Sequence, residues 1–269
     1  MLLKHIYYIN LDRRTDRWEE CMEKINSTCL KDFPYTRFSG FDGKEYVTEL
    51  ERFKSNSIYE EYMNQFDDKL SKLKGIFNKG EVGCIISHLC VLITILNNDN
   101  LKDDDYVSIF EEDFHYGETI ENFNKTFLSL NELDLNKLDI DFIYLGGRFK
   151  PNFHTKNNCY ASTDNVNIWR RSKYIPGHDN HRCTSSYVVK KSICKTLIQI
   201  IMDNFIKNTK LDPIDHIYQV LIDEIKSFDY FPHIFYSPIG YKSDIQVKPK
   251  SNIINTKLTL KNLMLGDKS

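Results

Sequence analysis

The stretch YVSIFEEDFHY, residues 106–116, joins an apolar run to three consecutive acidic residues, Glu111, Glu112 and Asp113. Tyr, Val, Ile and Phe in such a run are typical of a buried strand. Three neighbouring carboxylates repel one another unless a cation or a proton offsets their charge. The stretch therefore predicts a buried strand that ends at a binding site. The alternative is a solvated strand end whose acids pair with nearby Lys and Arg side chains.

On both sides of this stretch, strand patterns alternate with helix patterns. Further strands are predicted in HIYYIN (5–10), PYTRFSG (34–40), DFIYLGG (141–147) and TSSYVV (184–189). Helices are predicted after the first strand, with Thr15 as N-cap, and in 78–96, 190–206 and 212–225. Such alternation indicates an α/β sheet covered by helices on both faces. We expect a single domain over residues 1–247 and a polar tail or peripheral helix over 248–269.

The helix predicted at 78–96 has its apolar residues on one face, at Val82, Ile85, Ile86, Leu89, Ile93 and Leu96. Glu81, Cys84 and His88 lie together on another side. Two glycines enter this helix, but the segment contains neither a GxGxxG fingerprint nor a phosphate-binding loop. The sequence also lacks a GxSxG elbow and an HExxH motif.

Composition excludes several classes of protein. With 36 basic and 38 acidic residues the net charge is -2, so a nucleic-acid-binding protein is not expected. No apolar window is long enough to predict a transmembrane segment, and the N-terminus lacks the pattern of a signal peptide. The seven cysteines are scattered without a CxxC pair, which favours a reducing compartment. We expect a cytoplasmic protein; if the bias toward Asn, Ile and Lys reflects a viral origin, this means the host cytoplasm.

The segments after the first and the central strands could together bind a phosphate-containing ligand, the first directly and the second through a metal ion. Carboxylates at a strand end are ligands for a hard divalent cation, which can bridge phosphate oxygens. In INLDRRTDRW (9–18), a strand becomes a helix near Asn10, Arg13, Arg14 and Arg17, so backbone N–H groups and guanidinium groups could hold a phosphate or nucleotide hydroxyls. A solvated Arg-rich turn explains the same residues.

Taken in order, the segments YINLDRRTDRW, RFSGFDGKE, KGEVGCIISH, IFEEDF, DFIYLGGR, TSSYVV and PIDHIYQVLI resemble glycosyltransferase family 25. This family contains lipooligosaccharide and collagen galactosyltransferases, and the resemblance covers most of residues 4–246. It implies a GT-A-like (Rossmann-like) mixed sheet, a UDP-galactose or UDP-glucose donor and inversion at the anomeric carbon. It also implies a divalent metal, usually Mn²⁺. The family's EDD motif reads Glu111-Glu112-Asp113 here, and its Gly-Tyr after a strand Thr reads Ser186-Tyr187.

The resemblance also implies roles for individual residues. Asp215, in the segment that matches the family's PxD, is the expected general base, because an inverting transfer needs a group that deprotonates the acceptor hydroxyl. The alternative is that Asp215 has no catalytic role and only interacts with the dipole at the N-terminus of a helix. The expected metal ligands are Glu111, Glu112 and Asp113. The expected contacts to the donor are Asn10, Arg13, Arg17, Asp42, Gly43, Lys44, Glu81, Ser87, His88 and Asp244.

Two other functions stay open at the level of sequence. A nucleotidyltransferase can also place acids at strand ends, but it would release pyrophosphate from its donor. A non-catalytic relative that binds a nucleotide sugar or a glycan would bind the donor without turnover. Neither the acceptor, a glycan or a collagen-like hydroxylysine, nor the oligomeric state follows from the sequence.

Overall fold

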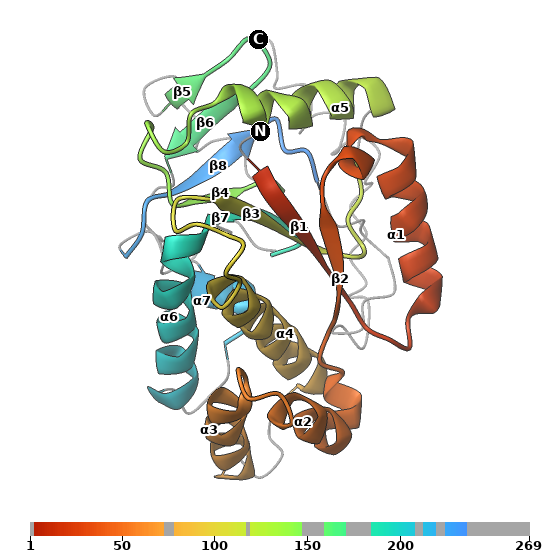
Figure 1. Cartoon of the computed structure of the whole chain (residues 1–269), viewed down its shortest axis with the longest axis vertical. Helices are drawn as coiled ribbons and strands as arrows, with labels where there is room; N and C mark the ends of the chain where they lie inside the picture. The colour runs from red at the N-terminus through yellow and green to blue at the C-terminus, as the bar shows by residue number, and fades with distance from the viewer. Residues whose placement is uncertain are drawn as a thin grey trace, which may run out of the picture.

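The computed structural model describes residues 3–72, 78–116, 119–146, 159–170, 184–207, 212–218 and 224–235. Within them an 8-stranded sheet has the order β2-β1-β3-β7-β4-β8-β6-β5 (Figure 1). The strands are β1 (Leu3–Asn10), β2 (Tyr35–Ser39), β3 (Tyr106–Glu111), β4 (Phe142–Tyr144), β5 (Cys159–Ser162), β6 (Asn167–Arg170), β7 (Ser186–Lys190) and β8 (Ser227–Phe231). β1, β2 and β3 are parallel, whereas β7 is antiparallel to both β3 and β4. The predicted mixed α/β architecture is confirmed.

Helices cover both faces of this sheet (Figure 1). They are α1 (Thr15–Ser27), α2 (Tyr46–Lys54), α3 (Glu60–Lys72), α4 (Lys79–Leu96), α5 (Ile120–Leu128), α6 (Cys194–Lys207) and α7 (Ile214–Ile217). Side chains of β1 alternate between two cores, as the pleat of a strand requires. Tyr7 and Ile9 pack with residues of α4 and α6, whereas Ile6 and Tyr8 pack with residues of α1 and α5.

α4 is the central helix of one core. Contrary to the sequence expectation, α4 is long and apolar enough to cross a membrane, but 67% of this helix is buried inside the fold. The sequence predicts one apolar face, yet Ser87, His88 and Val91 are also buried. This difference arises because α4 packs against α6, α7, β1 and the short turn η2 (Gly43–Glu45), which together enclose most of its surface.

Two glycines allow η2 to approach the first turn of α4. A Cβ atom on Gly43 would lie 1.7 Å from the carbonyl oxygen of Lys79, and one on Gly83 would lie 2.6 Å from that of Phe41. The Ser87 hydroxyl joins the same two segments: it accepts a hydrogen bond from the Phe41 N–H at 2.8 Å and donates one to the Gly83 carbonyl at 2.7 Å. The glycines of FDGKE and KGEVGC are therefore required by close backbone packing.

Gly43→Ala is expected to lower the free energy of unfolding more than Gly83→Ala does. The added methyl group would overlap the Lys79 backbone, and relieving such an overlap costs about 1–3 kcal/mol or more. Gly40→Ala is the matched control, because its nearest neighbours would lie at 3.2 Å and include the Ser87 side chain. Urea unfolding of the three variants measures their free energies of unfolding. A Gly43→Ala protein as stable as the parent would contradict this packing.

Three local features differ from the sequence predictions or extend them. α5 is a helix that the sequence patterns did not predict, and it buries Phe123 and Phe127. Arg14 occupies the N-cap position of α1, and Thr15 is the first residue of that helix. β5 and β6 form an antiparallel pair that the sequence patterns above do not predict. The predicted tail over 248–269 lies outside the described residues.

Candidate active site

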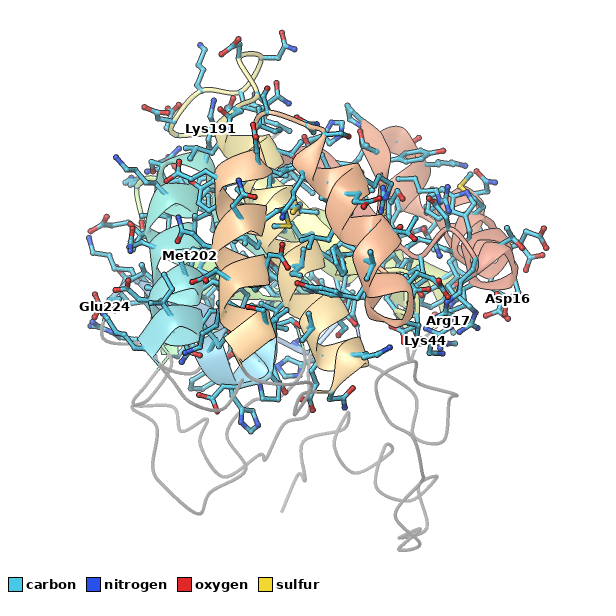
Figure 2. All side chains as sticks on the ribbon, turned by 90° about the horizontal axis from the view of Figure 1, so that it is seen from below. Asp16, Arg17, Lys44, Lys191, Met202 and Glu224 are labelled. Atoms are coloured by element: carbon cyan, nitrogen blue, oxygen red, sulfur yellow. The ribbon has the colours of Figure 1, made fainter. Side chains whose placement is uncertain are left out.

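The carboxyl ends of β1, β2 and β3 meet at one edge of the sheet, because the three strands are parallel. β7 begins at this edge, since it is antiparallel to β3. Figure 2 shows Arg17 and Lys44 near this edge and Lys191, which follows β7, at the opposite one. In α/β sheets ligands bind outside the carboxyl ends of the strands. The candidate site is therefore expected at this edge of the sheet.

Glu111 is the last residue of β3, and its side chain points toward α4, as those of Val107 and Ile109 do. His88 Nε2 lies 3.2 Å from Glu111 Oε1, and the Thr184 hydroxyl donates a hydrogen bond to the same oxygen at 3.0 Å. Burial tends to raise the pKa of Glu111, but the hydrogen bonds and the charge of His88 outweigh it, so this pKa lies below its usual value. Glu111 is thus held as a carboxylate.

Glu112 and Asp113 share the guanidinium of Arg17. Arg17 Nη1 lies 3.1 Å from Glu112 Oε1 and 3.5 Å from Asp113 Oδ2. Burial and then the charge of Asp113 raise the pKa of Glu112 to about 7, although Arg17 opposes this shift. Burial and then the charge of Glu111 raise the pKa of Asp113 to about 6, again against Arg17. A single guanidinium therefore does not offset the crowding of these carboxylates.

The positions of Arg17 and Glu112 differ from those that a direct contact to donor or metal would suggest. The sequence predicts Arg17 at the nucleotide and Glu112 at the metal, but the structure pairs the two side chains with each other. Their side chains are only 5% and 9% exposed. This pairing holds the segment FEED (110–113) against α1. Both residues therefore have a structural role that needs neither donor nor metal. Their direct contacts to donor and metal stay predictions.

Asp113 offers the carboxylate oxygen best suited to a cation. Its Oδ1 atom is buried and has no hydrogen-bond partner within the described part of the chain. A buried carboxylate oxygen without a partner is costly, and a bound cation would satisfy it. The oxygen atoms of Asp113 and of the neighbouring Glu111 match the hard ligands that Mn²⁺ and Mg²⁺ prefer. The residues present therefore fit the metal that the family resemblance implies.

Arg17→Ala is expected to lower the free energy of unfolding by about 3–5 kcal/mol, because it removes a buried partner from Glu112 and Asp113. Arg14→Ala is the matched control, since the Arg14 guanidinium pairs with the exposed Asp16 at 2.8 Å and its loss should change stability little. Urea unfolding at neutral pH compares the two variants. Equal losses in both would show that the Arg17 pairs do not stabilise the fold.

The turn after β1 brings five predicted donor-binding residues together. The Asn10 side-chain oxygen accepts hydrogen bonds from Arg37 at 2.9 and 2.7 Å. Arg13 is exposed and forms an ion pair with Asp42, whose other carboxylate oxygen accepts a hydrogen bond from the Lys44 N–H at 3.0 Å. Gly43 lies between the last two. The sequence prediction that these segments meet is thus supported by geometry, while contact to a donor stays a prediction.

Three more predicted residues lie on α4. Glu81 is half-buried in its first turn, whereas Ser87 and His88 are buried. His88 Nδ1 lies 2.9 Å from the hydroxyl of Tyr187, which lies 3.3 Å from that of Tyr218. Ser87 and His88 therefore join α4 to neighbouring elements. Asp244, the remaining predicted contact, lies outside the described residues.

Asp215, on α7, acts electrostatically on the same helix, α4, as the carboxylates of Glu111, Glu112 and Asp113. Burial raises the pKa of the Cys84 thiol most, and the charges of Glu111, Asp215, Asp113 and Glu112 raise it further. All four carboxylates thus act on one thiol of α4, although Asp215 follows β3 by more than a hundred residues in the sequence. The Asp215 carboxylate accepts a hydrogen bond from the adjacent backbone N–H at 3.0 Å. The predicted base therefore lies near the acidic end of β3.

A comparison with protein families supports the resemblance seen in the motifs. A family model described as glycosyltransferase family 25, LPS biosynthesis protein, matches residues 3–218. The chain belongs to glycosyltransferase family 25. The match includes the turn after β1, α4, FEED and Asp215, so the predicted site of this glycosyltransferase lies within it, apart from Asp244. A search of curated proteins found no match.

Three residues at the glycosyltransferase site were not predicted to belong to it. Cys84 lies one helical turn before His88, and this i, i+4 spacing is a signal that the sequence does contain. Thr184 and Tyr187 contact Glu111 and His88 only because β7 lies beside β3. Nothing in the sequence indicates that order of strands.

Proposed function

We propose that this glycosyltransferase moves galactose or glucose from a UDP-sugar to a hydroxyl group of an acceptor, with inversion and with a divalent metal. The observation that supports the proposal is that the charges of Glu111, Asp113 and Asp215 all act on one thiol, that of Cys84. Family membership supports a glycosyl transfer, and the Asp113 oxygen that has no hydrogen-bond partner among the described residues supports a cation beside the donor diphosphate. The donor, the stereochemistry and the metal are parts of the proposal.

Asp113 and Glu111 would hold the metal, with Mn²⁺ as the expected ion. When bound, such an ion supplies positive charge that stabilises the diphosphate leaving group. Glu111 is kept ionised by His88 and Thr184, which is the charge state that a ligand needs. Arg13, exposed at the turn after β1, would contact the nucleotide and is positioned by its ion pair with Asp42.

Asp215 would act on the acceptor. In an inverting transfer the acceptor oxygen forms a bond to the anomeric carbon as the bond to the UDP oxygen breaks, and the hydroxyl proton must leave. The Asp215 carboxylate would take that proton, and UDP would depart with the bonding electrons. Its placement near FEED but on a different element would allow it to face the acceptor rather than the diphosphate.

The acceptor is proposed to be a glycan. The matching family model is described as an LPS biosynthesis protein, which favours a saccharide hydroxyl over a collagen-like hydroxylysine. Both acceptors belong in the first assay, because either offers the hydroxyl that the mechanism requires. We expect the glycan to support the higher rate of UDP release.

A panel of UDP-sugars tests the proposed function. UDP-galactose or UDP-glucose with Mn²⁺ should raise the midpoint of thermal unfolding and release UDP, because a ligand that binds only the folded state stabilises it. The same donor with chelator should do neither, since the carboxylates would repel the diphosphate. Donor binding without turnover would identify a non-catalytic relative. Pyrophosphate as the product would identify a nucleotidyltransferase.

A further inference from the structure

A cluster of three different metal-binding side chains lies between α4 and the end of β3. Cys84 Sγ, an imidazole nitrogen of His88 and a carboxylate oxygen of Glu111 all lie within 4.8 Å of one another. Cys84 and His88 are four residues apart on α4, so they project from the same side of the helix. A thiolate, an imidazole and a carboxylate together are typical ligands of zinc, whereas Mn²⁺ and Mg²⁺ prefer oxygen ligands alone.

We propose that Cys84, His88 and Glu111 form a binding site for a borderline-soft divalent cation, with Zn²⁺ as the expected ion. The site differs in its ligand chemistry from the oxygen site of Asp113, although both include Glu111. It does not depend on the proposed sugar transfer, since its test measures metal binding by the protein alone.

The spacing of the ligand atoms needs little adjustment. Zinc bonds of about 2.0–2.3 Å in a tetrahedral site place ligand atoms roughly 3.3–3.7 Å apart. His88 Nε2 and Glu111 Oε1 are already separated by 3.2 Å. The Cys84 Sγ atom lies within 4.8 Å of both other ligand atoms, so an adjustment of about 1 Å would bring it to bonding distance of a shared zinc ion.

Residues behind the ligands already hold them in place. The Tyr187 hydroxyl lies 2.9 Å from His88 Nδ1, and Thr184 donates to Glu111 at 3.0 Å. Without metal, His88 forms a hydrogen bond to Glu111 through Nε2 and to Tyr187 through Nδ1. With metal at Nε2, the proton moves to Nδ1, which then donates to Tyr187, and Tyr187 can donate to Tyr218 instead. Such a partner for the second imidazole nitrogen is usual for a metal-bound histidine.

Three protein ligands leave one position open, as in a catalytic rather than a structural zinc site. The charges of Asp215, Asp113 and Glu112 also act on Cys84, so the surroundings favour a cation. Because Glu111 belongs to both sites, zinc bound by Cys84 and His88 would compete with Mn²⁺ for this carboxylate. We therefore expect micromolar Zn²⁺ to weaken Mn²⁺ binding.

Titration with Co²⁺, a spectroscopic substitute for Zn²⁺, tests the site in the full-length protein under reducing conditions. A thiolate bound to Co²⁺ gives an intense near-ultraviolet charge-transfer band, which oxygen and nitrogen ligands do not give. We expect one equivalent of Co²⁺ to produce this band and Zn²⁺ to abolish it by displacement. Tyr187→Phe keeps all three ligands and should weaken binding about 10–100-fold, because it removes the partner of His88.

Matched variants assign the band to its cysteine. Cys84→Ala should abolish it, whereas Cys90→Ala, on the same helix, should retain it. Cys183→Ala is a second control, because Cys183 lies outside the described residues and its contribution to the band must be measured. This variant should also retain the band. Far-ultraviolet circular dichroism confirms that each variant is folded. Absence of the band from the parent protein, or its survival in Cys84→Ala, would overturn the proposal even if sugar transfer is intact.

Discussion

Asp215→Asn is expected to lower the rate of sugar transfer by a factor of about 10²–10⁴ while leaving donor affinity near its parent value. The change keeps the size of the side chain but removes its ability to accept a proton. A base acts on the acceptor in the transition state, so its loss lowers turnover without weakening the ground-state complex. Asp215 lies on α7, and its charge acts on the same Cys84 thiol as the charges of Glu111 and Asp113.

A transfer assay and calorimetric titration of the UDP-sugar read out the two quantities separately. Asp203→Asn is the matched control, because Asp203 lies on α6 and pairs with Lys207 at 2.8 Å. This control should transfer sugar at the parent rate. If Asp215→Asn also does so, Asp215 has no part in the mechanism.

Asp113→Asn is expected to weaken metal binding, donor binding and turnover together. Within the described part of the chain Asp113 Oδ1 has no hydrogen-bond partner, so this oxygen fits a cation, and the asparagine removes the negative charge that attracts it. Loss of the metal would also remove the charge that holds the donor diphosphate. Calorimetric titrations of Mn²⁺ and of the UDP-sugar should therefore both show at least a tenfold loss, or about 1.4 kcal/mol.

Asp16→Asn is the control for this second change. Asp16 is exposed on α1, where it pairs with Arg14, and it lies on the same side of the molecule as Arg17 (Figure 2). Unchanged Mn²⁺ and donor binding in Asp113→Asn would mean that FEED is a strand end whose acids serve only Arg17 and their other protein partners.

The pH dependence of metal binding follows from the same carboxylates. Burial and the charge of Glu111 raise the pKa of Asp113 to about 6, so a proton competes with a cation there in the acid range. The metal binds the deprotonated form, and its apparent affinity should fall as the pH is lowered through about 6. A Mn²⁺ affinity that does not change between neutral and mildly acidic pH would argue against Asp113 as a ligand.

Local patterns in the sequence were enough to predict the elements that carry the site. The periodicity of 78–96 predicts α4, and the β-branched and aromatic runs predict β1 and β3, because these signals depend on residues close together in the chain. The association of Asn10 and Glu111 with one edge depends on the parallel pairing of β1 with β3, which the structure shows. α5 was missed although its buried Phe123 and Phe127 lie one helical turn apart.

Contacts between distant segments could not be predicted in this way. Arg17 and Glu112 are separated by 95 positions, and Thr184 and Glu111 by 73. The first pair forms because α1 packs behind the end of β3, and the second because β7 lies between β3 and β4. Arg17 was therefore predicted to contact the nucleotide, whereas the structure shows it buried against the acids that were expected to bind metal.

The sequence by itself determined the α/β class, the family and the acidic strand end, because each can be recognised from local runs of residues and their order along the chain. Only the tertiary structure decided how the three carboxylates are held. Glu111 contacts His88 and Thr184, Glu112 is paired with Arg17, and Asp113 keeps an oxygen that has no hydrogen-bond partner among the residues the structure describes. The physical reason is that burial and neighbouring charge set the state of each carboxylate. Those neighbours come from α1, α4 and the start of β7, and folding alone brings them together.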